Sequence, residues 1–182
     1  MSAPGLMTLA HSLDAAAADG PGAFEQAMRR HERLVLITAL RLLGNLPDAQ
    51  DAAQEVFLRL YRHRRMLESP ALASWLYRVT VNVCHDLARR RPAGELEGEP
   101  AAEAPDPQQQ MVEAERRRVL RMSLRVLPEK ERAALVLRDL EGLSTTDVAH
   151  ILGSSEATVR SQISKARVKV RDFVERYFRR RS

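Results

Sequence analysis

The sequence is poor in cysteine, in aromatic residues and in long apolar runs. Its only cysteine, Cys84, excludes an intramolecular disulfide framework and a cysteine-rich zinc site, and favours a reducing compartment. No run of eighteen apolar residues and no secretory leader pattern occur, so we expect neither membrane insertion nor export. Aromatic residues make up only 4% of the chain and no alternating strand pattern is present. Together with abundant Leu, Ala and Arg, these absences predict an all-α fold.

The net charge of +5 is distributed unevenly along the 182 residues. Residues 93–110 carry 5 acidic and no basic side chains, whereas residues 111–182 carry 17 basic and 10 acidic ones. A basic excess concentrated in one part of a chain is typical of phosphate binding. The C-terminal part is therefore expected to bind nucleic acid.

Residues 143–171 have the pattern of a helix, a tight turn and a longer basic helix. Ser144 and Asp147 have the spacing of a capping box, and Gly153 can adopt the left-handed conformation that ends a helix. Either Ser154 or Ser155 can cap the next helix. Ala149, Gly153 and Val159 supply a small crossing residue, a turn glycine and an apolar anchor, which predicts a helix-turn-helix.

The second of these helices has a buried stripe and basic faces. The stripe consists of Val159, Ile163, Ala166, Val170 and Phe173. Arginine can pair with guanine in the major groove, and serine and lysine can hold phosphates, which suits the polar residues Arg160, Ser161, Ser164, Lys165, Arg167 and Lys169. A solvated basic helix is the alternative, but it leaves the caps and the turn glycine unexplained.

The N-terminal half predicts three helices after a mobile segment at residues 1–20. They cover residues 24–43, ended by Gly44; 48–65, with Pro47 in the first turn; and 71–91, followed by Pro92. The predicted core residues are Leu36, Leu40 and Leu43; Ala53, Val56, Phe57 and Leu60; and Leu72, Trp75, Leu76, Val79, Val83 and Leu87.

A linker rich in Pro, Gly, Ala and Glu is predicted at residues 93–108. Helices at about 109–126 and 128–141 follow it, the latter with Ala134, Leu137 and Leu140 on its buried face. The C-terminal domain would then have four helices, with the DNA-reading helix last.

Two polar stripes lie outside these core faces. The first stripe changes from acidic to basic along the second helix and consists of Asp48, Asp51, Glu55, Arg59 and Arg62. This order fits either stabilisation by the helix dipole or a docking surface for a basic partner. On the third helix the second stripe consists of Arg78, Asn82, Asp86 and Arg89. Its basic end could simply complement the dipole at the helix C-terminus, or the stripe could form a nucleic-acid-binding surface.

Three segments in this order resemble bacterial RNA polymerase sigma factors of the extracytoplasmic function (ECF) group, group IV of the sigma-70 family. DAQDAAQEVFLRLY (48–61) is similar to region 2.2, ASWLYRVTVNVCHDLARRR (from Ala73) to regions 2.3 and 2.4, and LPEKERAALVLRDLEGLSTTDVAHILGSSEATVRSQISKAR (from Leu127) to region 4. The resemblance implies two small helical domains, a sigma region 2 domain at 21–92 and a sigma region 4 helix-turn-helix domain at 109–182, joined by a flexible acidic linker at 93–108.

The resemblance also implies roles for individual residues. The residues implied to bind core polymerase are Asp48, Asp51, Gln54, Glu55 and Arg59. Those implied to bind the −10 promoter element are Arg64, Arg65, Ser69, Arg78 and Asn82. Those implied to bind the −35 element are Glu156, Thr158, Arg160, Ser161, Ser164 and Lys165.

By this resemblance the chain is a transcription initiation factor and not an enzyme. The implied partners are core RNA polymerase, through its β′ clamp helices and β flap, promoter DNA and an anti-sigma factor. No cofactor, metal, small-molecule substrate or membrane insertion is expected, and the location is the bacterial cytoplasm, where an anti-sigma factor could hold the chain near the membrane.

Two other classes of function fit the sequence less well. A stand-alone helix-turn-helix regulator would need a receiver, a ligand pocket or a dimerisation heptad, and the N-terminal half shows none of these patterns. A nuclease would have to use His63, His85 and Asp86, but adjacent residues do not share a helix face and no second carboxylate is spaced for a metal. Cys84 is expected to be a core residue.

Overall fold

The computed structural model describes residues 21–90 and 107–180, and within these ranges the chain forms helices and no strand. The elements are α2 (Pro21–Leu43), α3 (Leu46–Arg62), a short 3₁₀ turn η1 (Arg64–Met66), α4 (Leu72–Arg90), α5 (Pro107–Arg125), α6 (Glu129–Leu135), a π-helix η2 (Val136–Leu140), α7 (Thr145–Leu152) and α8 (Glu156–Arg179). The all-α prediction is confirmed. The mobile segment predicted at 1–20 and nearly all of the predicted linker lie outside the described residues.

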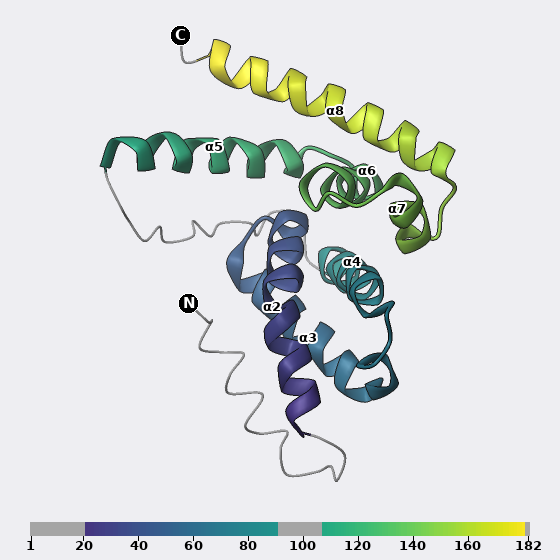
Figure 1. Cartoon of the computed structure of the whole chain (residues 1–182). Coiled ribbons are helices and arrows are strands. Elements are labelled where there is room, and N and C mark those ends of the chain that lie inside the picture. The colour runs from purple at the N-terminus through teal and green to yellow at the C-terminus, as the bar shows by residue number, and fades with distance from the viewer. Residues whose placement is uncertain (1–20, 91–106, 181–182) are drawn as a thin grey trace.

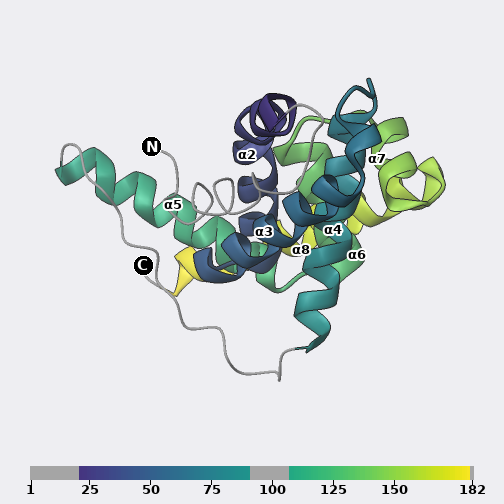
Figure 2. The same cartoon turned by 90° about the horizontal axis from the view of Figure 1, so that it is seen from below.

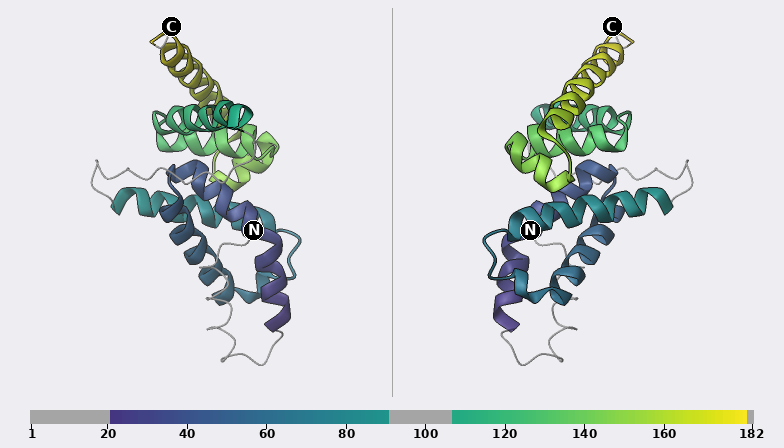
Figure 3. Two further views of the ribbon diagram at one scale, coloured as in Figure 1. Left: turned by 90° about the vertical axis from the view of Figure 1, so that its left-hand side faces the viewer. Right: turned by 90° about the vertical axis from the view of Figure 1, so that its right-hand side faces the viewer.

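Helices α2, α3 and α4 form the N-terminal bundle, and α5 to α8 form the C-terminal bundle. In Figure 1 the N-terminal bundle is the lower layer, α5 and α8 form the upper layer, and α6 and α7 lie between them. The two side views of Figure 3 show the same two layers, with the C-terminal half of α8 projecting beyond the rest of the molecule. A single apolar core nevertheless runs through both bundles, from Phe24 in α2 to Ala166 in α8.

Local signals set the helix ends in the N-terminal bundle. Gly44 ends α2 with a φ of +82°, a conformation that glycine adopts without strain. The Asn45 side chain then caps α3 by accepting from the Asp48 amide at 2.9 Å. Helix α3 thus begins two residues before the predicted start and ends at Arg62 instead of about 65.

Most of the predicted core positions are confirmed, with one shift in α2. Leu43 is buried, but Leu36 and Leu40 are only partly buried, and the most deeply buried side chains of α2 are Val35, Thr38 and Ala39. The apolar pattern could not show this shift, because α2 packs against α3 and α4 on one side and also against α5 and η2 of the C-terminal bundle.

Helix α4 is buried on two sides. The predicted stripe is confirmed for Leu72, Leu76, Val79 and Val83, while Trp75 and Leu87 pack at the margin of the core as partly buried side chains. A further set is buried that the stripe does not contain: Tyr77, Thr80, Val81 and Cys84. Helix α4 contacts α2 and α3 and also α7 of the C-terminal bundle, so it has no single solvent-facing half.

The C-terminal bundle has the four predicted helices with one irregularity. The segment predicted as one helix at 128–141 is α6 followed by η2, where the Glu141 amide donates to the Val136 carbonyl at 2.9 Å. Ala134 and Leu137 are buried as predicted, and Leu140 is partly buried. Seen from below in Figure 2, α7 lies beside α4.

Candidate nucleic-acid interface

The helix-turn-helix is formed by α7, the turn at 153–155 and α8. The Ser144 hydroxyl accepts from the Asp147 amide at 3.0 Å and caps α7, as predicted. Gly153 has a φ of +59° and ends α7. Of the two candidate serines, Ser155 caps α8, by accepting from the Thr158 amide at 3.1 Å. Two caps and one left-handed glycine therefore fix the angle between the helices.

Packing of the two helices leaves one face of α8 in solvent. Val159, Ile163 and Ala166 are buried, whereas the polar residues between them are exposed except Gln162, which is partly buried. The structure brings together on that exposed surface the predicted −35 residues Arg160, Ser161, Ser164 and Lys165. This surface presents a guanidinium, two hydroxyls and an ammonium, a donor set suited to base edges and phosphates.

The first turn of α8 is organised by its own hydrogen bonds. Glu156 accepts a hydrogen bond from the Thr146 hydroxyl at 2.7 Å and forms an ion pair with Arg160 one turn later. The Thr158 hydroxyl lies 2.8 Å from the Ser155 hydroxyl. Without DNA, then, Glu156 and Thr158 hold the start of α8 and the position of Arg160.

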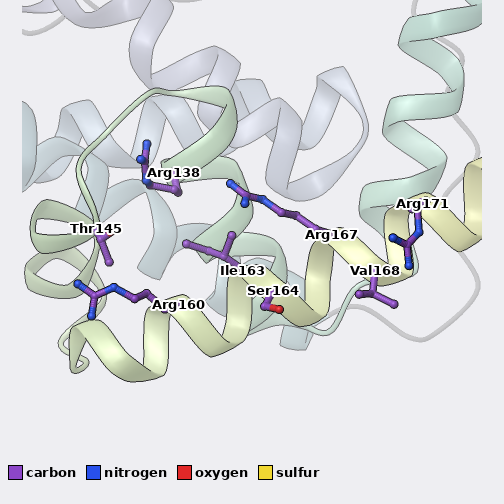
Figure 4. A pocket seen from close by; sticks show the side chains of 8 residues that line it. All are labelled: Arg138, Thr145, Arg160, Ile163, Ser164, Arg167, Val168 and Arg171. Carbon is purple, nitrogen blue, oxygen red and sulfur yellow. The ribbon is translucent and has the colours of Figure 1, made fainter.

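A groove of about 550 Å³ runs along this surface between η2, the start of α7 and α8. Figure 4 shows its lining: Arg138, Thr145, Arg160, Ile163, Ser164, Arg167, Val168 and Arg171. Arg138 belongs to η2, whereas Arg160 and Arg171 lie three turns apart on α8 itself. Four guanidinium groups around one open groove favour a polyanion such as the DNA backbone.

Sequence reasoning missed Arg138 and Arg171 as members of this site. Arg138 belongs to the preceding helix, and the π turn that places it against α8 has no recognised sequence pattern. Arg171 is one of several basic residues on α8, so charge alone does not distinguish it. Arg167 also lines the groove, but Asp139 engages its guanidinium through two hydrogen bonds of 2.7 and 2.8 Å. That ion pair raises the pKa of Arg167.

The acidic ridge of α3, here defined as Asp51, Gln54 and Glu55, lies opposite the buried face of that helix. Asp51 is exposed and Gln54 and Glu55 are half-buried, while Ala52, Ala53 and Val56 on the other side are fully buried. Arg59 lies one turn beyond the ridge and its Nε donates to Glu55 Oε1 at 2.8 Å. The ridge is an accessible acidic surface with one arginine at its end.

Asp48 does not lie on that accessible surface, in contrast to its predicted role. Asp48 is only 5% exposed, and its carboxylate accepts a hydrogen bond from the Asn45 side chain at 2.7 Å. Its amide is bound by the same asparagine. Asp48 therefore stabilises the start of α3, because a carboxylate in the first turn also matches the helix dipole.

The residues predicted to bind the −10 element lie on η1, the following loop and α4. The Arg64 guanidinium stacks over the Tyr61 ring at 4.3 Å, and Arg65 is exposed. The Ser69 hydroxyl accepts from the Ala71 amide at 3.2 Å. Asn82 is exposed on α4, whereas Arg78 donates to the His150 carbonyl of α7 at 2.5 Å. The structure thus leaves Arg65 and Asn82 accessible, and it engages Arg78 with the helix-turn-helix.

A second groove, of about 630 Å³, separates α5 from the C-terminal half of α8. Its lining combines apolar and arginine side chains: Arg118, Val126, Phe173, Arg176, Tyr177 and Arg180. Val126 is half exposed, as is Phe178, whose ring packs edge-on against Tyr177. This groove has apolar walls with a basic rim and lies away from the recognition face.

The residues considered for a nuclease do not form a site. His63 Nδ1 lies 2.9 Å from the Arg59 carbonyl, Asp86 accepts from Arg89, and His85 Nδ1 lies 2.9 Å from Glu129 Oε1. Burial lowers the pKa of His85, and Glu129 acts in the opposite direction. Over the two described ranges, no cluster of three or more His, Cys, Asp or Glu side chains could hold a metal ion. Nor is any helix there long and apolar enough to cross a bilayer.

The fold and this site define a two-bundle helical protein with a DNA-type helix-turn-helix in its second bundle. Two family models match the chain: Sigma-70 region 2 over residues 27–93 and Sigma-70, region 4 over residues 117–170. The sigma-E factor of Streptomyces coelicolor is 34% identical over 152 residues, which are 82% of this chain and 84% of that protein. The chain belongs to the family of ECF RNA polymerase sigma factors.

Other relatives differ in length from this chain. The ECF sigma factor SigE of Mycolicibacterium smegmatis is 35% identical over 160 residues, but the match covers 85% of this chain and only 62% of that protein. The ECF sigma-E factor of Escherichia coli is 31% identical over 147 residues, 73% of this chain and 77% of that protein.

Two solved structures share the fold. The sigma factor RpoE of Bartonella quintana, solved with the anti-sigma factor NepR, has a TM-score of 0.65 at 21% identity, over 84% of this chain and 96% of that one. CnrH, solved with the cytosolic domain of CnrY, has a TM-score of 0.60 at 24% identity, over 92% and 96%.

Proposed function

We propose that this chain is a transcription initiation factor that binds core RNA polymerase and directs it to promoters through their −10 and −35 elements. The observation that carries the proposal is the presence in one chain of two different surfaces. One is the acidic ridge on α3, and the other is the basic groove along α8. A protein that only bound DNA would gain nothing from an acidic ridge, because phosphates repel it.

The acidic ridge is assigned to core polymerase, with Asp51, Gln54 and Glu55 as its contacts and Arg59 orienting Glu55. The resemblance of residues 48–61 to region 2.2 supports the β′ clamp helices as the partner surface. Asp48 is left out of this assignment, because its burial gives it a role in the start of α3.

The DNA contacts are divided between the bundles. The loop and helix face bearing Arg64, Arg65, Ser69, Arg78 and Asn82 are assigned to the unpaired −10 bases. The exposed face of α8 is assigned to the −35 duplex, with Arg138 and Arg171 added as phosphate contacts at the sides of the groove. Arg160 is the candidate for base readout, since its guanidinium group can form two hydrogen bonds to guanine. Glu156 and Thr158 are assigned to the shape of the first turn of α8.

The domain limits follow from these assignments: a region 2 domain at 21–92, a linker up to the start of α5, and a region 4 domain from there to 182. Joining two weak DNA contacts through one linker raises the effective concentration of the second contact after the first has formed. The groove between α5 and α8 is the candidate site for the β flap, because its apolar walls can bury a partner segment.

Control by an anti-sigma factor in the bacterial cytoplasm completes the proposal. Its support is that one fold neighbour, RpoE of Bartonella quintana, was solved with an anti-sigma factor, and the other, CnrH, with the cytosolic domain of CnrY. An anti-sigma factor with a membrane anchor would hold the chain near the membrane until release.

The test is assembly with core polymerase. Purified protein mixed with bacterial core RNA polymerase is expected to co-elute with it in gel filtration and to open promoter DNA only as that complex. Tight, sequence-specific footprints without polymerase, together with no co-elution, would instead identify a stand-alone regulator.

A further inference from the structure

We propose that Thr146 and Glu156 are positioning residues, which hold the guanidinium of Arg160 and thereby set the base preference at one position of the −35 element. Neither of the two side chains has to touch that base itself. The inference rests on the proposed function, because it assumes that the exposed face of α8 meets the −35 duplex.

The Glu156 carboxylate joins the two helices of the helix-turn-helix. Thr146 is the second residue of α7, and its hydroxyl donates to Glu156 Oε1 at 2.7 Å. Glu156 is the first residue of α8, and its other oxygen, Oε2, accepts from Arg160 Nη2 one turn later. Each carboxylate oxygen therefore has a different partner. Thr146, Glu156 and Arg160 form a hydrogen-bonded triad that extends from α7 to the basic surface of α8.

The backbone that carries the triad is fixed on both helices. Ser144 caps α7 and Ser155 caps α8, each by accepting from the amide three residues later. Gly153 turns the chain between the helices with a φ of +59°. A carboxylate in the first turn of α8 also interacts favourably with the helix dipole. Glu156 thus accepts from both partners at a defined place in the turn.

Arg160 keeps enough donors to read a base while it is held. A guanidinium group carries five N–H donors, and the contact with Glu156 is made through Nη2. The N–H groups that remain on Nη1 and Nη2 can still form two hydrogen bonds to O6 and N7 of guanine. The Arg160 side chain is 64% exposed, so most of it is accessible to DNA.

Holding the guanidinium sharpens the selection of a base in two ways. A long side chain that is ordered before binding loses less entropy on contact, which is worth about two- to tenfold in affinity for the base that it fits. The Glu156 carboxylate also repels phosphate, and this disfavours a turn of Arg160 toward the DNA backbone. An arginine without this support can pair with a phosphate or with another base edge, so its discrimination falls.

Arg167 provides a comparison within the same groove. Its guanidinium is also held by a carboxylate, through two hydrogen bonds of 2.7 and 2.8 Å to Asp139 of η2. Figure 4 shows Arg160 and Arg167 along the groove that they line together with Thr145, the residue before Thr146. The groove therefore contains one acid–arginine pair that includes the candidate for base readout and a second pair that does not.

The test is the −35 base preference of the holoenzyme. Bacterial core RNA polymerase carrying each variant is bound to promoter fragments that contain every single-base change in the −35 element. Thr146→Val is close in size to the wild-type side chain but lacks the hydroxyl donor. It is expected to lower the preference about two- to tenfold at the position that responds to Arg160→Ala, and at no other position. Thr146→Ser keeps the donor and should restore the wild-type preferences.

A double variant, Thr146→Val with Arg160→Ala, separates positioning from packing. If Thr146 acts through Arg160, the double variant has the preferences of Arg160→Ala alone, because no guanidinium is left to position. A packing role of Thr146 between α7 and α8 would instead weaken binding to all −35 sequences by the same factor. Additive effects in the double variant, or a uniform loss in Thr146→Val, would overturn the proposal.

Glu156→Gln is the second variant, and it decides the question if Thr146→Val does not fold. Glutamine can accept from Thr146 but carries no charge for Arg160, so the preference should fall at the same position. A change at a different position would show that Glu156 contacts a base itself, contrary to the proposal.

The matched control is Asp139→Asn, which removes the charge of the pair with Arg167. It should leave the base preferences as they are in the wild type, and a loss of preference at the Arg160 position in this control would also overturn the proposal. Failure of the wild-type protein to assemble with core polymerase would overturn the proposed function, and this inference with it. Normal assembly and normal wild-type −35 preference, with unchanged preferences in Thr146→Val, would overturn the inference alone.

Discussion

Arg59 and Glu55 form an ion pair one turn apart on α3, with Arg59 Nε 2.8 Å from Glu55 Oε1. The pair lies at the end of the acidic ridge, on the side of α3 away from the core. Exposed pairs of this kind contribute only about 0–1 kcal/mol to stability. The ridge can therefore be altered with little effect on the fold, which separates docking from folding in an experiment.

Glu55→Arg is expected to abolish assembly with core polymerase, because it reverses the charge of one of the two carboxylates of the ridge. Gel filtration with core polymerase measures the loss, and circular dichroism should show unchanged helicity. The control is Glu25→Arg, which removes a similar Glu–Arg pair with Arg29 on α2. Equal loss of assembly in both variants, or unchanged assembly with Glu55→Arg, would remove α3 from the docking role.

Arg160→Ala and Lys165→Ala should weaken promoter binding in different ways. Arg160 is assigned to a base, so its loss should cost about 1–3 kcal/mol and relax the preference at one −35 position. Lys165 is assigned to phosphate, so its loss should weaken binding to all sequences alike. It should also reduce the number of counterions released on binding, read from the salt dependence of the affinity, by about one. Binding of holoenzyme to a set of single-base −35 variants at several salt concentrations tells the two effects apart. Identical sequence profiles for both variants would refute the assignment.

Gly153→Ala should destabilise the protein by about 1–2 kcal/mol, since residue 153 has a φ of +59°. A Cβ at this position would meet no atom within 4 Å, so the cost comes from the backbone alone. Gly22→Ala is the control, because it also has open space around it and lies in α2 with no positive φ. It should be neutral or slightly stabilising. Urea unfolding of both variants gives the comparison.

Tyr77 should make stability fall at high pH. Burial and the nearby Glu141 carboxylate raise the pKa of Tyr77 to about 12, from an ordinary value of about 10. The folded state therefore holds the phenol proton more tightly, and its contribution is complete below pH about 10 and is lost as the pH rises through about 12. Ultraviolet titration should show one tyrosine ionising near pH 12. That step should be absent in Tyr77→Phe, and its persistence would contradict the Glu141 contact.

Cys84 should be inert in the folded protein. Burial, assisted by the nearby Asp48, raises the pKa of its thiol to about 12, so the reactive thiolate is scarce. A thiol reagent should label less than a tenth of the native protein in the time that labels it fully in denaturant. Rapid labelling of native protein would show that α4 is not packed as described. Because Cys84 is the only cysteine, the reagent reports this one position.

The helix-turn-helix was the part of the molecule most accessible to sequence reasoning. Ser144, Gly153 and Val159 occupy their predicted positions because caps and turn glycines act over a few residues and have chemistry of their own. The serine that caps α8 could not be chosen in advance, since Ser154 and Ser155 are chemically equal and only the turn geometry separates them.

The contacts between the bundles were beyond sequence reasoning. Apolar periodicity predicts one buried face for each helix, whereas α4 also buries Tyr77 and Thr80, and α2 buries Thr38. Polar residues at such positions appear solvent-exposed in a pattern analysis, although here Thr38 and Tyr77 donate to Glu141 of the other bundle and Thr80 donates to the Leu76 carbonyl of its own helix. The π turn before Glu141 was missed for a related reason, because the sequence at 136–140 reads as ordinary helix. The burial of Asp48 could not be predicted, because its partner Asn45 lies before the helix and outside the apolar pattern.

Transcription reconstituted from purified components is the most direct test of whether this protein directs RNA polymerase to promoters. Core RNA polymerase, this protein and a library of promoter fragments are combined, and the start sites of the transcripts are mapped. We expect specific transcripts only when both proteins are present, with shared sequences about 10 and 35 base pairs upstream of each start. No specific transcript from the complete mixture, or the same transcripts without this protein, would contradict this expectation.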